Sequence, residues 1–175
     1  MAPSKLMIIR HGEKPADAPV KPPPHGVDVR GVANPHSLLP RGWQRAWALV
    51  RILADAPQPP LARPDVLFAP DYKHLVAFHR TSETITPLAH RLDTAIRTPV
   101  RKGEEAALVI DHLAGADGVA LVCWEHHHIP ALAEAFCAAV GLDPATLPPV
   151  ARAWPEEDFY SVVVFTRDEK GGYSV

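Results

Sequence analysis

The chain has 175 residues, which is the size of one domain and enough to bury a substantial core. Its hydrophobic content of 47% and charged content of 22% are those of an ordinary globular protein. The formal net charge of −2 gives no general attraction to nucleic acid or to an anionic membrane, so we expect neither as a partner. The apolar run at residues 6–9 is too short for a signal peptide or a transmembrane span, and we expect a cytoplasmic protein.

Short continuous apolar runs predict strands that are buried on both faces of a sheet. Five such runs occur along the chain, at residues 6–9, 65–69, 94–98, 119–124 and 159–165. Strands that alternate with helices predict an α/β fold, a three-layer α/β/α sandwich with a mainly parallel central sheet. The last strand is expected to lie antiparallel at an edge. The whole chain, residues 1–175, is expected to form a single domain.

Helices are predicted between these strands by apolar residues at steps of three and four, at residues 41–54 and 104–114. A third is expected to have Pro130 in its first turn and to end at Gly141. In the first of these helices, Trp43 and Trp47 are expected to pack in the core and at its rim.

A long proline-rich segment, at about residues 15–40, interrupts the alternation of strands and helices. It contains Pro22-Pro23-Pro24 and is expected to be a loop of the functional or disordered kind. Elsewhere, Cys123 and Cys137 lie in apolar stretches and are expected to be buried free thiols.

Two predicted strands end in residues that can carry chemistry. The first is followed by Arg10-His11-Gly12-Glu13-Lys14, and the strand from Val119 is followed by Glu125-His126-His127-His128. Open parallel sheets bind ligands beyond the carboxyl ends of their strands, so both groups are expected to face one crevice. A neutral imidazole at position 11 is a nucleophile toward phosphorus, and a neighbouring guanidinium binds phosphate oxygens. Arg80, which begins a predicted helix, adds a second anion-binding group.

The chain resembles the histidine phosphatase superfamily, whose fold is that of phosphoglycerate mutase. The resemblance covers essentially the whole chain and follows the family's order. It rests on residues 10–14, on a "Leu…Gly…Gln…Ala" pattern at residues 39–46, on the strand that ends in Ala69-Pro70, on Arg80-Thr81-Ser82-Glu83-Thr84, and on a histidine followed by Ile129-Pro130-Ala131-Leu132.

The resemblance implies that His11 is the nucleophile and that Arg10, Arg80 and a histidine of the second cluster form the phosphate pocket. His126 is preferred over His127 and His128 because it is the first to follow the strand, although a strict count lands on Glu125, an anion that would repel phosphate. The family's general acid comes from the loop after the third strand, where Glu104 and Glu105 lie, and Glu13 is a third candidate. Glu104 and Glu105 also suit the first turn of a helix.

The resemblance therefore implies a metal-independent phosphatase that acts through a phosphohistidine on His11 and needs no cofactor. Its substrate is expected to be a small phosphorylated molecule or a phosphoprotein, and the oligomeric state stays open. A phosphomutase with the same pocket and a non-catalytic phosphate-binding module are the alternatives. A catalytic metal site made by the clustered histidines is disfavoured, because adjacent side chains rarely bind one ion together.

Overall fold

Strand β1 (Lys5–Arg10) contributes side chains to two hydrophobic cores, one on each face of the sheet. Leu6 and Ile8 belong to one core, and Met7 and Ile9 belong to the other. Successive side chains of a strand point to opposite faces, so a continuous apolar run becomes a strand that is buried on both sides. The computed structural model that shows this describes residues 2–18, 20, 24–72 and 79–175.

The sheet has six strands in the order β3-β2-β4-β1-β5-β6. Strands β1 to β4 are mutually parallel, whereas β5 runs antiparallel to β1 and β6 runs antiparallel to β5. Besides β1, the strands span Val66–Phe68 (β2), Ile96–Arg97 (β3), Val119–Trp124 (β4), Val163–Arg167 (β5) and Tyr173–Ser174 (β6). The mainly parallel sheet predicted from the sequence is confirmed.

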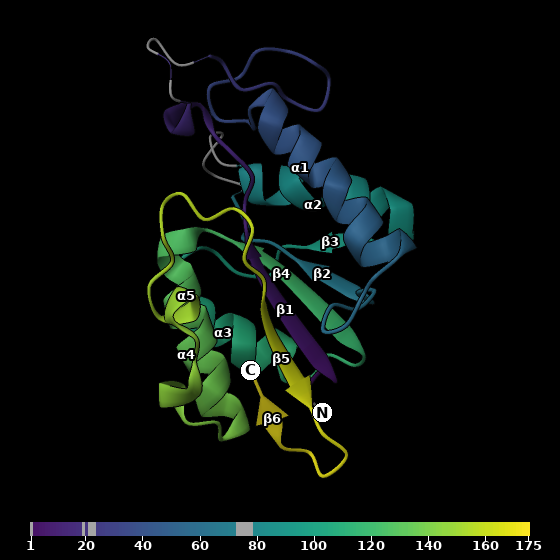
Figure 1. Ribbon diagram of the computed structural model, residues 1–175, viewed down its shortest axis with the longest axis vertical. Helices are drawn as coiled ribbons and strands as arrows, with labels where there is room; N and C mark the ends of the chain where they lie inside the picture. The colour runs from purple at the N-terminus through teal and green to yellow at the C-terminus, as the bar shows by residue number, and fades with distance from the viewer. Residues whose placement is uncertain (1, 19, 21–23, 73–78) are drawn as a thin grey trace.

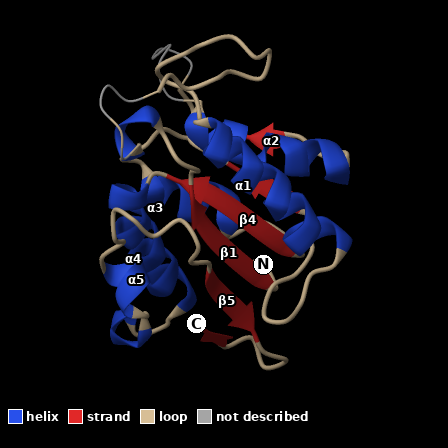
Figure 2. Cartoon of the chain, turned by 45° about the horizontal axis from the view of Figure 1, so that its top comes forward, coloured by secondary structure: helices blue, strands red, loops and turns tan. Residues whose placement is uncertain are grey.

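Helices cover both faces of this sheet (Figure 1 and Figure 2). Helices α1 and α2 lie side by side on one face, and α3, α4 and α5 lie on the other. Their bounds are Pro40–Val50 (α1), Arg80–Leu92 (α2), Glu105–Ala107 (α3), Ile129–Val140 (α4) and Pro149–Arg152 (α5). Helices α1 and α3 continue as π-helical segments, Arg51–Asp55 and Leu108–Leu113, and 3₁₀ turns occur at Pro15–Asp17, His126–His128 and Pro144–Thr146. The three-layer α/β/α architecture is the one expected.

Two details of the predicted strands are wrong. The last long strand begins at Val163 rather than at Phe159, because Asp158 accepts hydrogen bonds from the amides of Tyr160 and Ser161 and holds this segment in a turn. That strand is antiparallel, as expected, but it is not the edge of the sheet, since β6 pairs with its outer side.

The described part of the proline-rich segment is largely irregular, as predicted. It contains the 3₁₀ turn and one bridge between Val27 and Ala33, and residues 19 and 21–23 lie outside the described part of the chain. The cysteines at positions 123 and 137 are buried and unpaired by disulfide, as expected. None of the described helices has the length and apolar character needed to cross a membrane.

The carboxyl ends of β1 and β4 lie next to each other in the middle of the sheet. Arg10 pairs with Trp124 at the last register position, and the amide of His11 donates a hydrogen bond to the carbonyl of Trp124 (3.3 Å). The chain leaves β1 toward β2 on one side and leaves β4 toward β5 on the other. Such a change of direction opens a crevice at the strand ends, where open α/β sheets bind ligands.

Candidate active site

His11 is held in one tautomer directly after β1. Its ring is 3% exposed, and Nδ1 lies 2.7 Å from the carbonyl oxygen of Gly12. A carbonyl only accepts hydrogen bonds, so Nδ1 carries the proton and the neutral ring keeps a lone pair on Nε2. Burial, together with the positive charges of Arg10, Lys14 and Arg80, lowers the pKa of His11 from 6.5 to about 3. The imidazole is therefore neutral and nucleophilic at physiological pH.

Gly12 fixes the position of the backbone next to this imidazole. A Cβ at Gly12 would lie 3.1 Å from the backbone of Gly42 in α1, and a Cβ at Gly42 would lie 2.7 Å from the carbonyl oxygen of Glu13. The amide of Gly12 donates a hydrogen bond to Oγ1 of Thr84 in α2 (2.8 Å). The glycines at positions 12 and 42 thus let the end of β1 approach α1 closely, while Thr84 ties it to α2.

A cavity of about 120 Å³ opens beside His11. Lys14, Arg80 and Lys102 bring positive charge to its wall. The remaining lining residues are Tyr72, Thr81 and Glu125. Burial raises the pKa of Tyr72 to about 12, so this phenol keeps its proton at neutral pH. The small volume and the three cationic groups suit a phosphoryl group.

Arg80 reaches this cavity from the first turn of α2, as predicted from the sequence. Its Nη2 also donates to the carbonyl oxygen of Pro35 (3.2 Å), in the proline-rich segment. Thr81, the next residue, lines the same cavity. The positive end of the helix dipole and the guanidinium therefore act on an anion at one place.

Arg10 is the last residue of β1 and is 3% exposed. Its Nη1 donates to the carbonyl oxygens of Glu156 (2.5 Å) and Pro155 (3.2 Å), and its guanidinium lies 3.8 Å from the centre of the Phe159 ring. These contacts come from the segment before β5. Its side chains at positions 156 and 157 are exposed, but its backbone carbonyls hold Arg10 in place.

Of the three clustered histidines, His126 is the one that meets His11. Its ring is completely buried and lies edge-to-face with that of His11, with centroids 5.9 Å apart and an interplanar angle of 77°. Burial and the charge of Arg10 lower the pKa of His126 below its usual value. By contrast, 63% of the His127 side chain is exposed, and Nδ1 of His128 lies 3.1 Å from the Glu105 carboxylate.

The three predicted candidates for the general acid have other roles in the structure. Burial alone would raise the pKa of Glu13, but the hydrogen bonds from Arg45 (2.7 and 3.1 Å) and the charge of Arg41 lower it below its usual value. Glu105 is buried and accepts hydrogen bonds from Nε1 of Trp124 and the amide of Gly103, each at 2.9 Å. These hydrogen bonds fix the carboxylates of Glu13 and Glu105 in place.

Glu104, the third of these candidates, is exposed, and its carboxylate accepts a hydrogen bond from the amide of Arg101 (2.8 Å). In the part of the chain that the structure describes, it is not among the residues that line the cavity. An acidic residue that stabilises the start of a helix looks the same in sequence as one that serves a reaction, so Glu104 as general acid stays a prediction that the described cavity lining does not support.

Glu125 is the carboxylate that does line the cavity. One of its oxygens and one ring nitrogen from each of His11 and His126 lie within 4.8 Å of one another. Two atoms at such a separation can both lie about 2.8 Å from a shared oxygen atom. In the sequence, Glu125 stands where a strict count places the second histidine of the family, but a negative charge there was expected to repel phosphate. Lys14 and Lys102, whose place in the cavity was also not predicted, supply the compensating charge.

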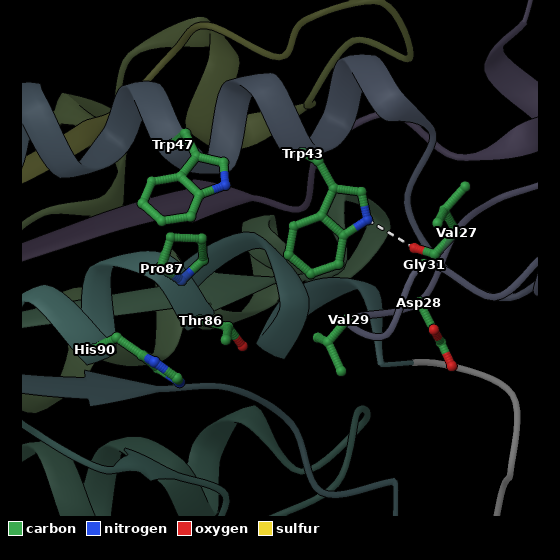
Figure 3. A pocket seen from close by; sticks show the side chains of 9 residues that line it. All are labelled: Val27, Asp28, Val29, Gly31, Trp43, Trp47, Thr86, Pro87 and His90. Atoms are coloured by element: carbon green, nitrogen blue, oxygen red, sulfur yellow. Dashed lines mark hydrogen bonds between the residues drawn. The ribbon is translucent and has the colours of Figure 1, made fainter.

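A larger cavity of about 430 Å³ lies outside the sheet region, between α1, α2 and the loop at residues 27–31 (Figure 3). The indoles of Trp43 and Trp47 line it along α1, with Pro87 of α2 opposite them, and Nε1 of Trp43 donates to the carbonyl oxygen of Val27 (2.7 Å). Trp47 is 65% exposed, so it lies outside the core. Asp28 and His90 are the titratable residues of its described lining, and no convergent group of cations or nucleophiles accompanies them there.

Comparison with solved structures finds chains of similar fold. The crystal structure of the "putative phosphohistidine phosphatase SixA" from Agrobacterium tumefaciens superposes with a TM-score of 0.50 and 16% sequence identity. The match covers 95% of this chain and 94% of that chain. It establishes a phosphoglycerate mutase-like α/β/α fold for this protein. No protein-family model and no curated protein sequence gives a significant match.

Proposed function

We propose that this protein is a phosphatase of the histidine phosphatase superfamily, which hydrolyses phosphate esters or phosphoramidates through a phosphohistidine on His11. The observation that carries the proposal is the state of the His11 ring: buried, protonated on Nδ1 by its bond to the Gly12 carbonyl, and facing a small cationic cavity. A neutral imidazole with its Nε2 lone pair at a phosphate-sized cavity is arranged for attack on phosphorus. The fold shared with a protein named for phosphohistidine hydrolysis is in keeping with this chemistry.

In the first step, Nε2 of His11 forms a bond to phosphorus while the bond from phosphorus to the leaving group breaks. Negative charge on the phosphoryl oxygens is balanced by Arg80, Lys14 and Lys102 at the cavity, with Arg10 behind it. In the second step, water attacks phosphorus, the N–P bond breaks, and inorganic phosphate and the neutral imidazole are released. Positioning and electrostatic stabilisation supply most of the rate in such transfers.

Glu125 is the group that we assign to proton transfer. Its carboxyl group lines the cavity next to His11. The acid form of this group can lie beside a bound phosphate without charge repulsion, and it is the form that can protonate a leaving atom. That proton passes to the leaving atom in the first step, and the resulting carboxylate accepts a proton from the attacking water in the second.

The cavity limits what part of a substrate is enclosed. Its volume of about 120 Å³ is well below the roughly 300–1,000 Å³ of sites that enclose a whole drug-sized ligand. The phosphoryl group is therefore held inside and the rest of the substrate remains at the surface. A phosphorylated protein side chain and a small phosphorylated molecule both satisfy this requirement.

Hydrolysis of an aryl phosphate by the wild-type protein and by His11→Asn tests the proposal. We expect steady release of phosphate by the wild type and only the background rate with the variant. His90→Asn, an exposed histidine of α2, is the matched control and keeps wild-type activity. Equal rates for wild type and His11→Asn would reject the proposal, and binding of phosphate without any turnover would favour the non-catalytic alternative.

A further inference from the structure

We propose that His126, His127 and Glu156 form a binding site for a divalent transition-metal ion such as Zn²⁺, beside the phosphate cavity. His126 and His127 belong to the 3₁₀ turn after β4, and Glu156 belongs to the segment before β5. Oε1 of Glu156 lies 3.3 Å from Nε2 of His126 and 3.3 Å from Nε2 of His127. The three ligand atoms all lie within 4.8 Å of one another.

The separations match those between ligands of one ion. Zn²⁺ binds imidazole nitrogen at about 2.0–2.1 Å in a tetrahedral arrangement, which puts neighbouring ligand atoms about 3.3–3.4 Å apart. The two observed N···O distances of 3.3 Å have this value and exceed the usual range of about 2.7–3.2 Å for an N–H···O hydrogen bond. Imidazole and carboxylate are also ligand types that zinc takes.

The surroundings orient the buried ligand. Nδ1 of His126 lies 3.4 Å from Oε1 of Glu125, so a carboxylate faces the ring nitrogen opposite to the one that faces Glu156. Metal-bound histidines commonly present their second nitrogen to a carboxylate in this way, which leaves the first free to bind the metal. Because 63% of the His127 side chain and 57% of the Glu156 side chain are exposed, solvent can supply a fourth ligand.

His126 and His127 are adjacent in sequence, and adjacent side chains rarely bind one ion together. In a strand their side chains would point to opposite faces. The chain has already left β4 at Trp124, however, and in the following turn the two rings lie side by side, with centroids 4.0 Å apart and a tilt of 37°. Their Nε2 atoms therefore converge on one carboxylate oxygen.

Positive charges near the site weaken the binding of a cation, so we expect the ion to bind reversibly. The positive charge of Arg10 acts on His126, and that of Lys14 acts on Glu156, so a dication is opposed by both. A bound ion fixes the His126 ring, whose centroid lies 5.9 Å from that of His11, so this ring can no longer adjust to a phosphoryl group bound beside His11. Inhibition of hydrolysis follows; this consequence rests on the proposed function, whereas metal binding does not.

The direct test is titration of the protein with Zn²⁺ in a calorimeter and with Co²⁺ by visible absorption. We expect one ion per chain and the absorption of tetrahedral Co²⁺ for the wild type and for Glu157→Gln, a control in the neighbouring exposed carboxylate. His127→Ala and Glu156→Gln should each weaken binding at least tenfold while circular dichroism shows that both remain folded. Absence of binding to the wild type, or unchanged binding in both ligand variants, overturns the proposal.

Aryl phosphate hydrolysis provides the second test. Zn²⁺ should inhibit the wild type reversibly, with activity restored by a chelator, and at least tenfold more Zn²⁺ should be needed with His127→Ala or Glu156→Gln. Without metal, both variants should keep their activity, since neither side chain lines the phosphate cavity in the described structure. Inhibition that is equal in all of them would place the ion on His11, Glu125 and His126 instead and overturn the proposal. If the wild type hydrolyses nothing, the proposed function fails and the binding titration alone decides on the metal site.

Discussion

The imidazole rings of His11 and His126 lie edge-to-face, 5.9 Å apart, although 115 positions separate them in the sequence. The sheet explains this contact, because Arg10 and Trp124 pair at the ends of two adjacent parallel strands. The next residues of both strands must leave the sheet at the same point. The two histidines that follow β1 and β4 are thus brought together by strand register.

Removal of the Arg80 guanidinium should damage the reaction more than it damages the fold. Arg80→Ala is expected to lower kcat/KM for an aryl phosphate by roughly 10²–10³-fold, because a preorganised donor to the developing charge is lost. Arg91→Ala, on the same helix, is the control: Arg91 is exposed and pairs with Asp55 (2.7 Å). Comparable losses in the two variants would remove Arg80 from the transition state.

Exchange of Glu125 for glutamine should make activity depend on the leaving group. An alkyl phosphate needs a proton on its leaving oxygen, so its hydrolysis should fall by roughly 10²–10⁴-fold in Glu125→Gln. An aryl phosphate with an acidic leaving group should be affected much less in the phosphorylation step. Glu104→Gln should leave both rates unchanged, and the reverse pattern in these two variants would return the role of acid to Glu104. The readout is kcat/KM for both substrates.

Thr84→Val should lower both stability and activity. The completely buried Oγ1 of Thr84 accepts from the Gly12 amide (2.8 Å) and donates to the Arg80 carbonyl (2.7 Å). Its loss leaves a buried amide without its acceptor, which costs about 1–3 kcal/mol. In Thr86→Val the lost hydroxyl is half-buried and bonds to Ser82 of the same helix, so about 0.5 kcal/mol or less is expected. Urea unfolding of the two variants measures the difference.

The depressed pKa of His11 predicts a loss of stability in acid. The unfolded chain binds a proton at His11 below pH 6.5, whereas the folded protein does so only near pH 3. Its contribution to stability is therefore complete above pH 6.5 and is lost progressively as the pH falls toward 3. Between pH 7.5 and pH 4.5, wild type should lose about 3 kcal/mol more than His11→Asn, measured by denaturant unfolding at both values. Equal losses would mean that the His11 ring takes up a proton in the folded state as readily as in the unfolded one.

The parts of the site that were predictable from the sequence are those fixed by strands. Uninterrupted apolar runs predict β1 and β4, and the two strands end, as predicted, directly before His11 and Glu125. The segment from Phe159 has the same apolar and aromatic character, yet its first residue packs against the Arg10 guanidinium (3.8 Å) rather than in the sheet. Composition cannot separate these cases, because the turn depends on hydrogen bonds to one carboxylate, that of Asp158.

The place of Glu125 in the cavity was not predicted, for an electrostatic reason. Glu125 was set aside because an isolated carboxylate repels phosphate. Its environment includes Lys14 from the end of β1 and Lys102 from the loop after β3, residues that only the folded structure brings to the same cavity. Glu104 and Glu105 were candidates because of their place in the chain, but Glu104 accepts a hydrogen bond from the Arg101 amide and Glu105 accepts one from the Trp124 indole.

The most direct test of a phosphohistidine on His11 is to trap it. The enzyme is mixed with a substrate carrying a radioactive phosphoryl group and quenched during turnover, and the bound label is then mapped to a peptide. We expect label in the peptide containing His11, stable in alkali and lost in acid, and none in His11→Asn. Turnover by the wild type without such label, or equal label in His11→Asn, would contradict the mechanism.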